Sequence, residues 1–259
     1  MRSERTWPLF HVCTASFAVR GSCWLLLGGA LLFAWLAPLI TPWEEKPVIL
    51  QPARAQAAWL YAWLALFTWL PFQGAALGSR LRKEGILEHM RAGGSRPWDL
   101  FLQINASVLA WAAGLAVIAA GICVLFCSPS NPAEAGRWFG LVVQYAMLYG
   151  IVAMPLLMLA VALGTRTSEV IAFLVPVGLL VLGLFGSGWL EPMFTQGGSP
   201  FLKSLWLLIP HYHLADLTPR LVFKMGPLPI SSFLQTATCL GFEGLAFFLF
   251  GLCAFRTRS

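Results

Sequence analysis

The residues with the clearest potential for chemistry lie in the last third of the chain. Ser187 stands between two glycines, and His211 and His213 follow further along. A serine beside a histidine base is the core of nucleophilic hydrolysis, so an intramembrane hydrolase is one hypothesis. Against it, Ser187 falls near the end of a predicted span, where a Gly-Ser-Gly cluster is typical of helix packing. The histidines are two residues apart with no third ligand in view, which does not indicate a metal site.

Glu243 is the one acidic residue deep inside a predicted span, about halfway along residues 232–255. A carboxylate at the centre of a bilayer costs on the order of 3 kcal/mol, so we expect Glu243 to face the bundle interior or to be protonated. Gln144 or Asn105, from other spans, could supply a hydrogen bond. These three residues are therefore candidates for lining a transport pathway or for gating, and a packing role for protonated Glu243 is the alternative.

These side chains must be positioned by an unusually apolar chain. Of its 259 residues, 58% are hydrophobic and 11% are charged, which is too little polar surface to cover a soluble globule of this size. A membrane-spanning helix needs about 20 mostly apolar residues. The sequence predicts a single all-α transmembrane domain over residues 1–259, with six spans at about 18–40, 56–78, 100–126, 138–163, 169–190 and 232–255.

Lysine and arginine are distributed unevenly around these spans. The formal net charge is +6, but in such a chain it reflects the excess of basic residues in cytoplasmic loops, so we expect no nucleic-acid partner. With the N-terminus inside, 11 of the 17 basic residues fall on the cytoplasmic side. We expect a multi-pass protein of the cell (inner) membrane with both termini in the cytoplasm. The 11 residues are Arg2, Arg5, Arg20, Arg80, Arg82, Lys83, Arg91, Arg96, Arg166, Arg256 and Arg258.

Two segments outside the spans are also predicted to be helical. Residues 7–20 are moderately apolar and end at a basic residue, which suits a helix lying in the membrane interface before the first span. The outer segment 190–231 is too long for a plain loop and contains the apolar run FLKSLWLLIP, so it predicts short re-entrant helices before the last span. The six cysteines lie in or beside apolar segments without a C-x-x-C pair, which favours packing over metal binding.

The most strongly charged segment, residues 79–98, lies between the second and third spans and reads SRLRKEGILEHMRAGGSRPW. Its pattern predicts a short amphipathic helix at the membrane surface. On a helix Glu84, Glu88 and Arg91 share one face, and Leu87 and Met90 lie beside them and could offer apolar contacts. We interpret the segment as a docking site for a cytoplasmic partner, with a simple solvated loop as the alternative.

The order of residues in this loop resembles the cytoplasmic loop of type-2 ABC transporter permeases. A basic cluster is followed by Glu84, Gly85, Leu87 and Glu88, and then by a Ser-Arg pair before the third span. The segment IPHYHLADL at 209–217 is similar to one that many bacterial members carry before the sixth span. The resemblance extends to six spans with inner termini and a long outer segment.

The resemblance implies a permease subunit that acts as an exporter of an unknown substrate and pairs with a second permease copy or a related permease. It also implies cytoplasmic ABC ATPase subunits that use ATP and Mg²⁺, because the chain has no G-x-x-x-x-G-K-[ST] loop of its own. We expect this chain to bind no cofactor and to be no enzyme, and an ion-coupled secondary transporter is the main alternative. The implied coupling residues are Arg82, Lys83, Glu84, Gly85, Leu87, Glu88, Met90, Arg91, Ser95 and Arg96.

Overall fold

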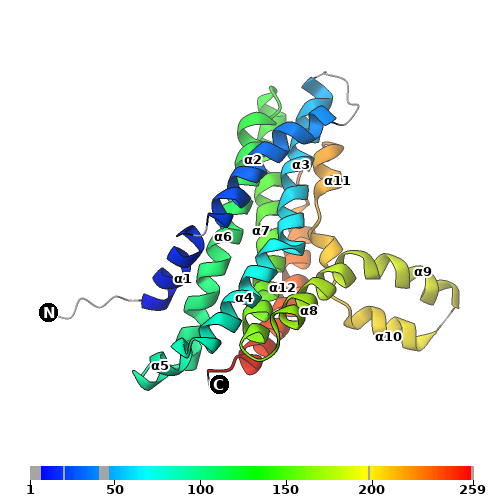
Figure 1. Ribbon diagram of the computed structural model, residues 1–259. Coiled ribbons are helices and arrows are strands. Elements are labelled where there is room, and N and C mark those ends of the chain that lie inside the picture. The colour runs from blue at the N-terminus through cyan, green and yellow to red at the C-terminus, as the bar shows by residue number, and fades with distance from the viewer. Residues whose placement is uncertain (1–6, 20, 41–46, 198, 258–259) are drawn as a thin grey trace.

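The computed structural model describes residues 7–19, 21–40, 47–197 and 199–257, and every regular element within these ranges is helical. Long helices run side by side, and a helical hairpin projects from the bundle (Figure 1). The elements are α1 (Pro8–Val19), α2 (Ser22–Ile40), α3 (Pro47–Phe67), α4 (Trp69–Lys83), α5 (Ile86–Ala92), α6 (Pro97–Phe126), α7 (Pro132–Gly164), α8 (Glu169–Val181), the π-helix η1 (Leu182–Gly186), α9 (Ser187–Gly197), α10 (Pro200–Leu208), the 3-10 helix η2 (Tyr212–Ala215), α11 (Thr218–Val222) and α12 (Ile230–Ala254).

Five helical stretches are long and apolar enough to cross a membrane, and a sixth is added if α1 and α2 count as one bent span. This confirms the all-α class and the apolar spans, although the first span differs in detail from the prediction over 18–40. Its first residues belong to α1, which makes an angle of 62° with α2. Gly21 stands at the start of α2 with a φ of 71°, a conformation that favours glycine. That α1 lies in the membrane interface stays a prediction.

The central helix of the bundle is α7, which packs against α4, α6, α8 and α12. Most of its inward-facing side chains are fully buried. Its contact with α4 is especially close, because a Cβ atom added to Gly78 would overlap with the backbone carbonyl of Val161, and one added to Gly164 would overlap with that of Ala75. Small residues allow such approach of two membrane helices. The two glycines therefore fix the spacing of α4 and α7.

The fifth predicted span, 169–190, is helical throughout but changes its winding. It starts as α8, widens into η1 and continues as α9. Beyond it, α9 and α10 form the hairpin that projects sideways from the bundle, drawn in yellow in Figure 1. With η2 and α11, these elements confirm that the outer segment 190–231 contains short helices. Their entry into the membrane stays a prediction.

The charged loop lies at one end of the bundle. In Figure 1, α5, the turn between α7 and α8 and the last turn of α12 gather at the lower end, while α11 and the turn between α6 and α7 lie at the upper end. We call these the α5 end and the α11 end. The sequence predicts the α5 end to be cytoplasmic.

Candidate functional site

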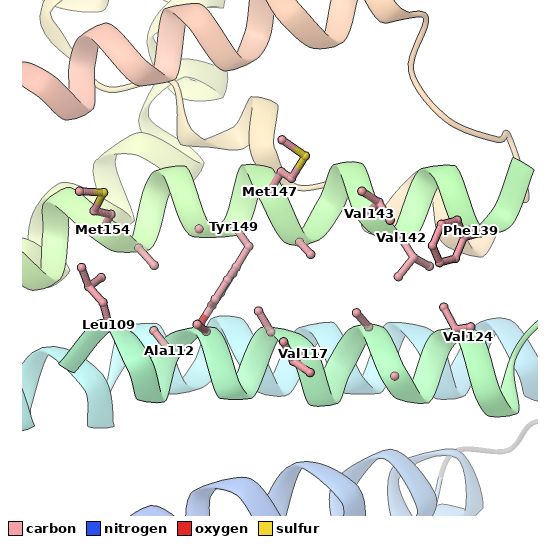
Figure 2. Close-up of a pocket in the computed structure, with 17 residues that line it drawn as sticks. Leu109, Ala112, Val117, Val124, Phe139, Val142, Val143, Met147, Tyr149 and Met154 are labelled. Carbon is pink, nitrogen blue, oxygen red and sulfur yellow. The ribbon is translucent and has the colours of Figure 1, made fainter. Parts of the chain in front are cut away.

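A cavity of about 590 Å³ forms a groove between α6 and α7 (Figure 2). Its described lining contains no charged side chain, and its walls are mostly alanine, valine and methionine. Tyr149 reaches from α7 across to α6, but its hydroxyl donates to the carbonyl of Ala62 at 3.0 Å. This apolar groove offers no group for chemistry, and the polar side chains instead form a cluster near the α11 end.

A tyrosine of α7 is the centre of that cluster. Tyr145 is fully buried, and its ring stacks on Trp59 with 4.1 Å between centroids. Its hydroxyl accepts a hydrogen bond from Trp63 Nε1 at 2.8 Å and donates to Asp216 Oδ1 at 2.7 Å. The Thr218 hydroxyl lies 2.7 Å away and completes the set of partners. The buried polar groups of Tyr145 and Trp63 thus both have partners, as buried polar groups generally do, while Asp216 itself is exposed.

The same network holds a carboxylate at the edge of a second cavity. Asp216 Oδ1 also accepts from the backbone N–H of Thr218 at 3.0 Å, which is the local turn that an aspartate favours. The Asp216 side chain borders a cavity of about 310 Å³ between α3, η1 and the segment around η2. Its lining residues are Gln56, Leu60, Trp63, Phe67, Leu184, Phe185, His213, Asp216 and Thr218.

The structure brings Ser187 and His213 together, as the hydrolase hypothesis requires. Ser187 Oγ lies 2.8 Å from His213 Nδ1, at the point where η1 passes into α9. The widened turn is packed closely, because a methyl group on Gly183 would overlap with the ring of Tyr212. Burial, and then the neighbouring His211, lower the pKa of His213, which favours the neutral imidazole.

A nucleophilic serine also needs a third group that orients the histidine and stabilises its charged form. Among the described residues no carboxylate contacts His213, and the nearby acid, Glu243, contacts His211 instead. Ser187 is 4% exposed, which limits the approach of a substrate to its oxygen. The pair therefore lacks the complete arrangement of a hydrolase and acts as a link between η2 and α9.

Glu243 lies on α12 and faces the η2 segment rather than another span. Its carboxylate accepts from the backbone N–H of His211 at 3.2 Å and lies 3.4 Å from His211 Nδ1. The predicted partners are wrong. Gln144 is engaged with both backbone groups of Leu228, at 2.9 and 2.7 Å, and Asn105 donates to the carbonyl of Phe101 in its own helix. Gln144 is thus bound by the segment before α12 and Asn105 by its own helix, and the segment that leads into η2 supplies the partner of Glu243.

No metal site is visible in this cluster. His211 and His213 have ring centroids 5.8 Å apart. Within the described ranges, no three His, Cys, Asp or Glu side chains are placed to hold a metal ion.

At the α5 end, the predicted coupling residues form one connected structure. Gly85 has a φ of 67° and starts α5 in the left-handed conformation that favours glycine. Arg91 Nη1 donates to the Thr257 hydroxyl at 3.0 Å, and Arg82 Nη1 donates to the carbonyl of Thr165 at 3.2 Å. These contacts tie the loop to the chain's last residues and to the turn between α7 and α8.

The apolar face of α5 is turned toward the bundle. Leu87 is 1% exposed, and Ile86 and Met90 pack beside it against the core. The expectation that Leu87 would offer a contact to a partner is therefore wrong, because the chain itself buries this side chain. Met90 is half-buried, and its contact with a partner stays a prediction. The opposite face of α5 is exposed and carries Glu88 and Arg91, and Ser95 beyond the helix is half-buried.

An ion pair lies beside this face, between Lys83 and Glu169 at 2.9 Å. We define the coupling surface as the exposed residues Glu84, Glu88, Arg91 and Arg96.

In comparisons with known proteins, no family model, no curated protein and no solved structure matches this chain.

Proposed function

We propose that the chain is the permease subunit of a transporter of the type-2 ABC kind, driven by a separate ATPase that docks on the coupling surface. The observation that carries this proposal is α5, a short helix between two spans that buries its apolar face on its own bundle. Glu88 and Arg91 on α5, and Glu84 and Arg96 in the turns on either side of it, are exposed. A loop kept only for membrane orientation needs no such fixed helix. Charged, exposed and anchored residues suit a partner that binds and detaches in each cycle.

The anchoring supports mechanical coupling. Arg82 and Arg91 link the α5 segment to the turn after α7 and to the chain's last described residues. The close contact between α4 and α7 involves Gly78 and Gly164, which lie near the ends of these helices at the α5 end. A displacement of α5 would therefore be passed to several spans through packed backbone rather than through flexible side chains. A second copy, or a related permease, would complete the pathway.

The proposal is tested by reversing charge on the coupling surface. The tagged chain is purified from its native membranes, and its eluate is assayed for ATP hydrolysis and for a protein carrying a G-x-x-x-x-G-K-[ST] sequence. We expect Glu84→Lys with Glu88→Lys to lose both. Glu134→Lys is the matched control, because Glu134 is an exposed acid at the α11 end. Absence of any such protein from the wild-type eluate, or its retention by the double variant, would sink the proposal.

A second candidate, ion-coupled transport, is favoured by one observation. Glu243 on α12 and His211 at the start of η2 form a carboxylate–imidazole contact, with the Glu243 side chain 22% exposed. Such pairs serve proton transfer in transporters. The purified chain in sealed vesicles should then carry protons down a pH gradient without ATP, and Glu243→Gln should abolish the flux. An equal flux in empty vesicles would remove this candidate.

A further inference from the structure

The cavity beside Asp216 has the size and the boundaries of a small-molecule site. Its volume of about 310 Å³ lies at the lower end of the roughly 300–1,000 Å³ typical of ligand pockets. It is formed by one face of α3, by η1, and by the segment that contains η2 and α11. Three separate parts of the chain therefore converge on it, which is how most ligand sites are built.

The charge on the described lining of the cavity is negative. Among the described residues that line it, Asp216 is the only acid and there is no lysine or arginine. His213 adds no charge near neutral pH, because burial and His211 lower its pKa. Oxygen Oδ1 of Asp216 is engaged with Tyr145 and Thr218. Within the described chain its other oxygen has no hydrogen-bond donor, so the carboxylate keeps one side for a ligand.

The remaining walls are aromatic and aliphatic. Trp63, Phe67 and Phe185 line the cavity together with two leucines. Trp63 is held in place by the bond from its Nε1 to Tyr145, and Phe185 is 52% exposed at the edge. Aromatic faces attract cations, and aromatic and aliphatic surfaces bury apolar groups.

We propose that this cavity binds a lipophilic organic cation, such as an amine or a quaternary ammonium compound, with its charge at Asp216 and its apolar body against Trp63, Phe67 and Phe185. An anion of the same size would be repelled by the Asp216 carboxylate, because the described lining has no lysine or arginine to bind it. The inference stands on the cavity alone and does not depend on an ATPase at the opposite end. Its failure would thus leave the proposed function untouched.

The test is equilibrium binding of benzyltrimethylammonium to the full chain in lipid nanodiscs, with empty nanodiscs as background. We expect saturable binding that weakens about tenfold in Asp216→Asn, as the loss of one charge-assisted contact implies. Benzenesulfonate, an anion of similar size, should not bind saturably. Glu191→Gln is the matched control, since it removes an exposed acid that is not part of the described lining.

A second variant keeps the test decisive if Asp216→Asn is poorly folded. Phe185→Ala removes an exposed aromatic wall and leaves the Tyr145 network intact, and we expect it to weaken cation binding several-fold. No saturable binding by the wild type would overturn the inference. So would equal affinity in Asp216→Asn and the wild type, an equal loss in Glu191→Gln, or benzenesulfonate binding as tightly as the cation.

Discussion

The α5 end and the α11 end of the bundle are built on the same central helix in opposite ways. Toward the α5 end, α7 meets α4 through Gly78 and Gly164, with backbone against backbone and the charges on the outside. Toward the α11 end, α7 carries Tyr145, whose buried hydroxyl hydrogen-bonds to Trp63 and Asp216 next to a cavity. The first arrangement leaves little room to deform, which suits the transmission of displacement that we propose. The second leaves space in which a ligand can lie.

Breaking the close helix contact should have the largest effect. Gly164→Val places a side chain against the backbone of Ala75, which cannot rotate away. Overpacking costs about 1–3 kcal/mol, and a backbone clash belongs at the upper end of that range. The free energy of unfolding in detergent, measured by denaturant titration, should fall accordingly. Gly150→Ala on the same helix has open space around it and should change little; equal losses in the two variants would contradict the close contact.

Removing the Tyr145 hydroxyl tests the polar interior of the other half. Tyr145→Phe leaves Trp63 Nε1, in a side chain that is 6% exposed, without its acceptor. A buried unsatisfied group costs about 1–3 kcal/mol. Tyr149→Phe is the matched variant, because it removes a single bond to the carbonyl of Ala62 and should cost about 1 kcal/mol. Thermal unfolding of both variants should rank them in this order, and the reverse order would count against Tyr145 as the centre of the network.

A pH series tests the link between η2 and α9. The folded pKa of His213 is lowered, first by burial and then by His211, whereas the unfolded chain binds its proton near the usual 6.5. The unfolded state therefore holds more protons below that pH, and stability should fall as the pH decreases through about 6.5. Groups facing this ring also include Glu191 and Glu243.

His213→Gln should flatten this dependence while keeping a polar partner for Ser187. Unfolding midpoints at about pH 7.5 and about pH 5.5 are sufficient, since histidine changes charge between them. The same decrease in stability in His213→Gln as in the wild type would assign the effect to another group.

The smallest effect is expected at the surface of the α5 end. Lys83 is 72% exposed in its pair with Glu169, and exposed ion pairs are worth about 0–1 kcal/mol. Lys83→Gln should thus lower the unfolding free energy by less than about 1 kcal/mol, and less still at high salt. A loss that is larger, or that persists at high salt, would indicate that this end depends on its charges for stability.

Sequence and structure agree where a feature follows from a continuous stretch of residues. Apolar runs of span length predict the helices, and the alternation of charge in 79–98 predicts α5. Contacts between distant segments could not be predicted in this way: Tyr145 and Asp216 are 71 residues apart, and no periodic pattern relates them. The partner of Glu243 could not be predicted either, because His211 lies in the segment between two spans and not in a span that packs against α12. The sequence shows the amphipathic pattern of α5, but this pattern does not determine whether Leu87 packs on the chain itself or on a partner.

The measurement that tests the central claim most directly is site-specific crosslinking in native cells. A photo-reactive amino acid is placed at position 88 on the coupling surface and, separately, at position 134 at the α11 end. We predict that position 88 forms an adduct with a protein that contains a nucleotide-binding G-x-x-x-x-G-K-[ST] sequence, and that position 134 does not. An adduct with that protein from position 134, or none from position 88, would contradict the account.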